Sequence, residues 1–204
     1  MVSASSPEVP TSTYRPASAW WLAGISWLLA LAGMALAIAQ MGPRALLEGW
    51  PFYVVAFLGW WLFYYPKVTI SSVGINVHNP VRTISIPWSA LSNIETKFAL
   101  TLVAGDRRFG VWAAPAGGAF SSRRGGKDSM PPGQNLESGM RASELLNSPS
   151  GGVAHMIRRE WQRLIESGKL GNAQEVSVRI NVAPLAGALA LLLFAVVVST
   201  RIFA

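Results

Sequence analysis

The stretch that decides the fold runs from Lys67 to Ala114 and reads KVTISSVGINVHNPVRTISIPWSALSNIETKFALTLVAGDRRFGVWAA. Short runs rich in valine, isoleucine and threonine alternate there with turn residues, and we expect about five strands of a twisted antiparallel sheet. Residues two apart in a strand face the same side, so each run presents one apolar face. The apolar positions that repeat in this way are Val68 and Ile70, Ile75 and Val77, Ile84, Ile86 and Trp88, Phe98, Leu100 and Leu102, and Phe109 and Val111.

Glycine and proline mark where these strands end. Gly74 can supply the positive φ that a tight turn after the first strand needs. The next turns fall at residues 79–80 (Asn-Pro) and 105–106 (Gly-Asp). Pro87 ends the third strand because it cannot donate a hydrogen bond to the ladder. Residues 89–93 are expected to form a short helical or irregular bridge.

These residues resemble a known family, the bacterial pleckstrin-homology-like (PH-like) domains of actinobacterial membrane proteins of the low-molecular-weight antigen type. The resemblance implies a partly open β-barrel that is capped by one C-terminal helix, although fewer strands can be counted here than the family fold has. It rests on the runs Val68-x-Ile70-x3-Gly74-Ile75-x-Val77, Ile84-x-Ile86-Pro87-Trp88 and Leu91-x2-Ile94, and on a later strand from Arg108 to Trp112.

Three charge-free apolar runs lie outside the β stretch. Residues 19–41 would form a helix of about 34 Å, enough for a hydrocarbon core of about 30 Å. The run 50–65 is shorter and strongly aromatic, and 180–200 is the third. The sequence therefore predicts a transmembrane hairpin over 19–66 and a C-terminal transmembrane helix over 180–204.

The N-terminal residues allow a second interpretation of the first run. Residues 1–18 are polar, rich in serine, threonine and proline, and expected to be disordered. Residues 37–39 (Ala-Ile-Ala) have the small-x-small form of a signal-peptidase site. Against cleavage, the apolar run is long and Arg15 is the only basic residue before it. We therefore expect a retained helix.

Aromatic residues gather at the ends of the two N-terminal runs. Trp20 and Trp21 begin the first run, and two tryptophans and two tyrosines lie within residues 60–65. An antiparallel helix pair would place both groups at the same membrane face as an aromatic belt. An aromatic ligand cage is the alternative.

The segment 115–151 changes composition abruptly to glycine, serine, proline and alanine. Such a segment buries too little apolar surface to offset the entropy of ordering it, so we expect a disordered insertion. Arg123, Arg124 and Lys127 lie within it and are the candidate contacts to anionic lipid headgroups. A solvated loop without lipid contact is the alternative.

Helical periodicity returns at residues 153–167, where one stripe is apolar and Gly168 is placed to end the helix. The resemblance requires this helix as the cap of the barrel, with Trp161 and the strand residue Trp88 as the structural core. An interfacial membrane helix is the alternative.

Charge indicates the orientation. The net charge is +7 although only 13% of residues are charged, which favours a membrane protein with basic flanks over a nucleic-acid binder. The segment 67–179 holds 14 lysines and arginines, whereas the hairpin loop holds only Arg44. The positive-inside rule therefore places 67–179 in the cytoplasm as a PH-like domain.

Catalytic and metal-binding patterns are missing from the sequence. Without cysteine there are neither disulfides nor thiolate ligands. His78 and His155 are too few for a metal site, and Glu95 has no carboxylate partner for acid–base chemistry. Hydrolase, zinc-protease and P-loop motifs do not occur. We therefore expect no enzymatic activity, cofactor or metal.

The expected protein is an α+β multi-pass membrane protein whose partners are the lipid bilayer and an unidentified protein, with no nucleic acid. Its expected role is a non-enzymatic interaction or scaffold module; a lipid-headgroup sensor or accessory subunit of a membrane complex is the alternative. Eukaryotic pleckstrin-homology domains often bind phosphoinositides through basic residues in their first β-turn. The corresponding turn here, residues 71–74, carries no positive charge, so phosphoinositide binding is not expected. Small residues four apart, such as Ala183 and Gly187, would allow a homo-oligomer.

Overall fold

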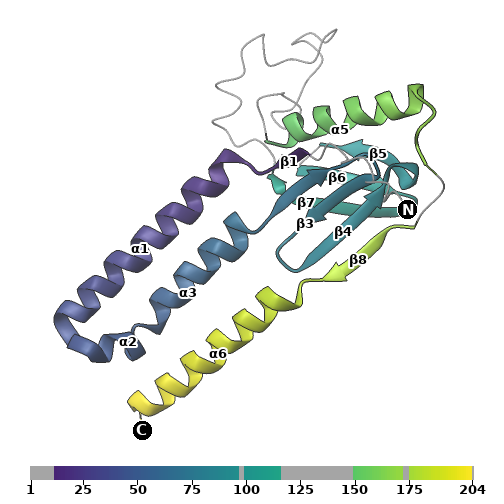
Figure 1. Ribbon diagram of the computed structural model, residues 1–204. Coiled ribbons are helices and arrows are strands. Elements are labelled where there is room, and N and C mark those ends of the chain that lie inside the picture. The colour runs from purple at the N-terminus through teal and green to yellow at the C-terminus, as the bar shows by residue number, and fades with distance from the viewer. Residues whose placement is uncertain (1–11, 97–98, 116–148, 172–174, 204) are drawn as a thin grey trace, which may run out of the picture. The chain divides into compact units, whose positions relative to one another are not determined.

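The computed structural model describes residues 12–96, 99–115, 149–171 and 175–203, and these form two compact units (Figure 1). The β unit comprises the chain up to Arg15, Lys67–Asn79 and Thr83–Val178. The helical unit comprises Pro16–Pro66, Pro80–Arg82 and Arg179–Ala204. The expected α+β class with antiparallel strands is confirmed.

Two sheets make up the β unit, one with the strand order β1-β2-β3-β4-β8 and one with the order β5-β6-β7. The strands from β2 to β7 follow one another through short connections, and the turn at Gly105 uses a φ of 57°, as the Gly-Asp pair predicts. The strands are β1 (Ser12–Tyr14), β2 (Lys67–Ile70), β3 (Gly74–His78), β4 (Arg82–Pro87), β5 (Leu91–Glu95), β6 (Ala99–Ala104), β7 (Arg107–Pro115) and β8 (Ser177–Ile180).

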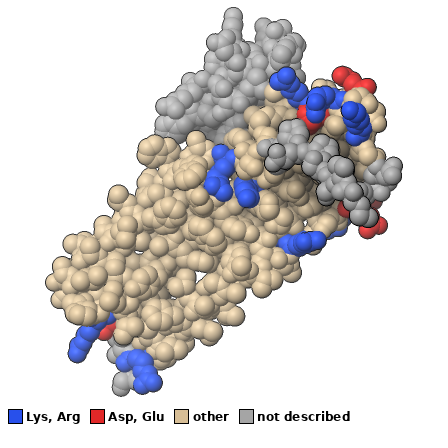
Figure 2. Space-filling view, in the orientation of Figure 1, with Lys and Arg blue, Asp and Glu red and all other residues tan. Residues whose placement is uncertain are grey.

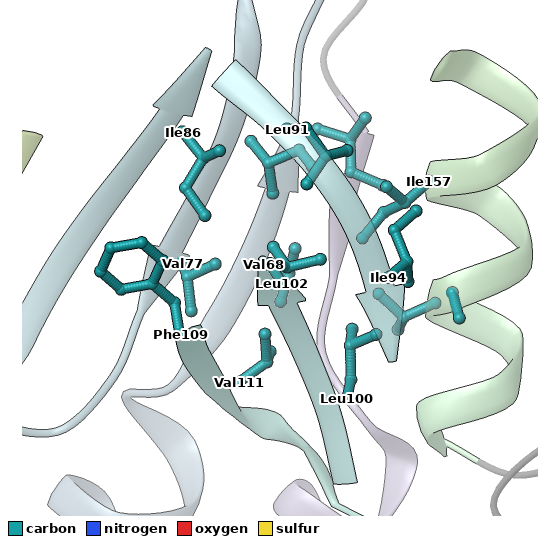
Figure 3. Close-up of a cluster of buried hydrophobic side chains, with 14 of the residues drawn as sticks. Val68, Val77, Ile86, Leu91, Ile94, Leu100, Leu102, Phe109, Val111 and Ile157 are labelled. Atoms are coloured by element: carbon teal, nitrogen blue, oxygen red, sulfur yellow. The ribbon is translucent and has the colours of Figure 1, made fainter. Parts of the chain in front are cut away.

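The core lies between the two sheets and the helix α5 (Pro149–Glu166), as Figure 3 shows. The alternation predicted from the sequence holds, because Val68, Val77 and Leu102 are fully buried while their neighbours are partly exposed. Ile157 brings the apolar stripe of α5 to the same cluster. Gly168, with a φ of 64°, ends the last helical turn.

Three strands lie at least partly where the sequence predicted none: β1 and β8 of the five-stranded sheet, and β5 of the other sheet. Residues 1–18 were expected to be disordered, but β1 forms within them and pairs with β2. Ile180, expected in the last transmembrane helix, belongs to β8. β1 and β8 are short edge strands whose residues are mostly exposed, so their sequences lack the apolar alternation that would predict a strand. The bridge expected at 89–93 is a 3-10 turn over Trp88–Ala90, followed directly by β5.

Gly74 is required for a different reason from the predicted one. Among the described residues a positive φ occurs only at other glycines, so the expected turn conformation is wrong here. A Cβ at position 74 would instead collide with the Ile86 carbonyl oxygen and lie 2.9 Å from the Pro87 Cα. The glycine therefore permits the close approach of β3 to β4, not a left-handed turn.

The helical unit contains three main helical segments. Its elements are α1 (Ala17–Met41), the 3-10 turn Gly42–Arg44, α2 (Ala45–Glu48), α3 (Trp50–Leu58), a π-helical continuation η2 (Gly59–Tyr64) and α6 (Val182–Phe203). The Trp27 indole of α1 donates to the Ala56 carbonyl of α3 at 3.1 Å. Gly187 of α6 packs against Phe57 on another side of α3. The small residue predicted to permit helix packing therefore packs within the chain.

Two helices are long and apolar enough to cross a membrane, Ala17–Glu48 and Val182–Arg201. The first lies near the N-terminus, where a signal sequence would have the same length and composition. The third predicted span, Trp50–Tyr64, is a shorter apolar helix. Figure 2 shows that no charged side chain lies over the middle of the helices on the face in view.

Candidate functional site

The three connections between strands and the helices of the helical unit lie at one end of the five-stranded sheet, which we call the tethered end. The strand registers place them together, because Tyr14 pairs with Val68, and Lys67 pairs with His78. At β8, the Asn181 amide donates to the Val81 carbonyl, in the turn before β4, at 2.9 Å. The connectors are residues 15–16 before α1, 65–66 after η2, and 181 before α6. The opposite, free end holds the β2–β3 turn (71–73) and Pro87.

The tethered end is basic. Four cations lie in the connectors or in the strand residues next to this end: Arg15 in the first connector, Lys67 at the start of β2, Arg82 at the start of β4 and Arg179 near the end of β8. Arg82 and Arg179 are exposed, and Lys67 is partly exposed. The tethered end is therefore suited to negatively charged neighbours.

Asn79 fixes strand β7 to this end of the sheet. Its side-chain amide donates from Nδ2 to the Gly110 carbonyl at 2.8 Å and accepts at Oδ1 from the Trp112 backbone N–H at 2.9 Å. One side chain thus pairs with β7 as a neighbouring strand would. Trp112, held in this way, exposes 54% of its surface.

A groove of about 430 Å³ opens between α5 and the β1–β2 edge, towards the free end. Ser12, Ile70 and Ser71 line its sheet side. The helix side carries residues three to four apart, which share one face of α5: Met156, Arg159, Glu160 and Arg163. The two arginines and one glutamate give a formal charge of +1.

The acidic residue of the groove is already paired. Arg163 donates to both carboxylate oxygens of Glu160, from Nη2 at 2.6 Å and from Nε at 3.1 Å. The hydrogen bond to Glu160, followed by the attraction between the charges, raises the pKa of Arg163. A ligand with negative charge would therefore find Arg159 as a second cation beside this ion pair.

Two titratable residues on strands at the tethered end are perturbed. Burial lowers the pKa of His78, and the neighbouring charge of Lys67 lowers it further. His78 Nδ1 also lies 3.2 Å from the Thr83 hydroxyl. Burial raises the pKa of Tyr14. Both changes favour the neutral side chain, so these residues behave as packed strand residues.

The residues predicted as structural core or as lipid contacts have different outcomes in the structure. Trp88 is 1% exposed, and its indole N–H donates to the Ser71 carbonyl at 2.8 Å. Trp161 is only half-buried and packs against the edge of the core. The predicted lipid contacts, Arg123, Arg124 and Lys127, lie outside the described residues.

In the described part of the chain, no group of three or more histidine, aspartate or glutamate residues is placed to hold a metal ion. Glu95 pairs with Arg108 at 2.8 Å. The groove was missed because it depends on β1, which carries no sequence signal, so the arginines of α5 were assigned only to the polar face of the helix.

Comparison with known proteins adds no relative, since no family model, no curated protein and no solved structure matches the chain. The functional assignment therefore depends on the geometry of the β unit and on the resemblance of its sequence motifs.

Proposed function

We propose that the protein is a membrane-anchored, non-enzymatic interaction or scaffold module whose β unit is a PH-like domain. The observation that carries this proposal is the tethered end, where connectors of one or two residues join strands directly to helices. Such connectors reach only a few ångströms, at about 3.3–3.6 Å per residue. The β domain is thus confined to the membrane surface, where it presents its free end.

The same connectivity supports the proposal of three membrane spans. The chain leaves the β domain at Ala17 and returns to it at Lys67, as expected if the intervening segment crosses the bilayer twice. The continuous helical residues 50–64 would extend about 22 Å, so the second span also needs the residues of α2, before the turn at Gly49, to cover a hydrocarbon core of about 30 Å. The PH-like assignment is supported by two antiparallel sheets, a shared core and the C-terminal helix α5.

The cytoplasm is the proposed compartment of the β domain. Four cations lie at the tethered end, whereas the opposite ends of the helices carry Arg44, Arg201 and the acidic Glu48. Short basic segments beside membrane helices are retained on the cytoplasmic side. The proposed protein is therefore a multi-pass protein of the cell membrane.

The groove is the proposed partner site. It opens beside the edge strand β1, and edge strands with an adjacent helix accept extended peptide segments. Its formal charge of +1 and the hydroxyl of the exposed Ser12 suit a segment that carries carboxylates. A protein partner with an acidic extended segment is thus the best fit.

Site-specific photocrosslinking in intact cells tests this proposal. A photoreactive residue in place of Met156, inside the groove, should give a discrete protein adduct, and Arg159→Glu should weaken it. The matched control is the same replacement at His155, which is exposed on α5 but does not line the groove. Equal adducts from both positions, or none from 156, would contradict a groove-bound partner.

A lipid-headgroup sensor is the second candidate, and the basic tethered end favours it. In the same experiment, lipid adducts from a photoreactive residue in place of Lys67, at the tethered end, together with no protein adduct at position 156, would select this candidate. The two functions are thus distinguished by the mass of the crosslinked species.

A further inference from the structure

Trp112 is the largest apolar side chain that the β unit leaves in solvent. On strand β7 the alternate residues Phe109, Val111 and Ala113 are buried, so Trp112 points away from the core and is 54% exposed. The two other tryptophans of this unit, Trp88 and Trp161, are buried or half-buried. A large exposed aromatic with a polar N–H is typical of surfaces that are partly apolar and partly wet.

The position of Trp112 is fixed within the β unit. Its backbone N–H is bonded to Asn79, and Asn79 also holds the Gly110 carbonyl two residues earlier. Asn79 begins the turn between β3 and β4. It directly follows His78, the last residue of β3, and His78 pairs with Lys67 of β2. Trp112 therefore lies at the tethered end, beside the residues through which the chain enters its helices.

The surroundings of Trp112 match those of a membrane–water interface. Four cations lie in the connectors or in the strand residues next to them, and none of the three connectors contains a carboxylate. Anionic headgroups attract such cations, and tryptophan is enriched at the headgroup level of membrane proteins. The connectors of one or two residues keep this end of the sheet close to where the helices enter lipid.

We infer that Trp112 inserts into the lipid headgroup layer and anchors the β unit by its tethered end. The partner of this surface is the bilayer that holds the helices. The inference rests on the proposed membrane placement but not on the groove or its protein partner. It assigns lipid contact to a strand residue at a defined end of the sheet, apart from the basic insertion predicted from the sequence.

The absence of cysteine makes a direct test available in the full chain. Trp112→Cys and Val73→Cys are each labelled with an environment-sensitive fluorophore and reconstituted in vesicles of phosphatidylcholine and phosphatidylglycerol. Val73 is the matched control because it is 70% exposed but lies in the β2–β3 turn at the free end. A phospholipid with a nitroxide at the headgroup serves as the quencher, and flotation verifies that the chain is inserted.

Position 112 should lose most of its emission to the nitroxide lipid, and position 73 should keep it. Equal quenching at both positions, or none at position 112 in co-floating protein, would overturn the inference. Protection of position 112 from aqueous iodide without lipid quenching would overturn it and assign the surface to a second copy of the chain. Failure of the chain to co-float would overturn both the inference and the proposed membrane placement.

Discussion

Replacing Trp88 by alanine should destabilise the β unit more than the same change at either of its other tryptophans. Trp88 is 1% exposed, so truncation leaves a nearly complete cavity and costs about 3–5 kcal/mol. Loss of its hydrogen bond to Ser71 adds about 0.5–1.5 kcal/mol. Trp161 is partly buried and Trp112 is 54% exposed, so truncating either should lower the free energy of unfolding by less than Trp88→Ala does, with the smallest loss for Trp112→Ala.

The cysteine-free chain again provides the assay. A reporter cysteine at Ala113, which is 2% exposed, reacts with a thiol reagent only when the β unit opens. Urea titration of all three variants in this background, in detergent, gives their midpoints. With a slope of about 1–3 kcal/mol per molar urea, Trp88→Ala should lower the midpoint by at least about 1 M. Equal midpoints for Trp88→Ala and Trp112→Ala would refute the assignment of Trp88 to the core.

Three further predictions concern pH, topology and strand packing. The pKa of His78 lies below its ordinary 6.5 in the folded chain, so as pH decreases this histidine is protonated in the unfolded chain before it is protonated in the folded chain. The urea midpoint should therefore fall as pH decreases from 6.5 through the folded pKa, and His78→Gln should reduce this dependence. In intact cells, an impermeant thiol reagent should label Ala204→Cys but not Ser92→Cys; the reverse pattern would invert the proposed orientation. Gly74→Ala should cost about 1–3 kcal/mol in the urea assay because its neighbours are rigid backbone, whereas the control Gly110→Ala, which has open space around it, should be close to neutral.

The sequence predicted the part of the fold that depends on burial. Alternation works when one face of a strand is shielded from water and the other is not, and this holds for β2, β3, β4, β6 and β7. The helix α5 was equally predictable, because its apolar stripe faces the same core. Each of these elements can be predicted from its own sequence, because each buries apolar residues that recur with the period of a strand or a helix.

Elements that are stabilised by pairing alone could not be predicted in this way. β1 has three residues and β8 has four, and nearly all of their side chains are exposed. Their stability comes from backbone hydrogen bonds to β2 and β4, which leave no periodic pattern. The groove beside β1 was missed partly for the same reason, since Ser12 joins Ile70 and Ser71 on its sheet side only when β1 is paired. Gly74 is similar, because its close contact with β4 is a tertiary constraint.

The two short edge strands also determine where each proposed activity can occur. β1 and β8 both run directly into helices, so they extend the sheet at the end where the chain meets lipid. Lipid contact through Trp112 uses that end, and the groove lies towards the other end, beside the Ser71 turn. A partner bound in the groove would therefore not compete with the bilayer for the same residues. Changes at Arg159 should alter partner binding without releasing position 112 from lipid, and a coupled loss of both would show that the two surfaces are one site.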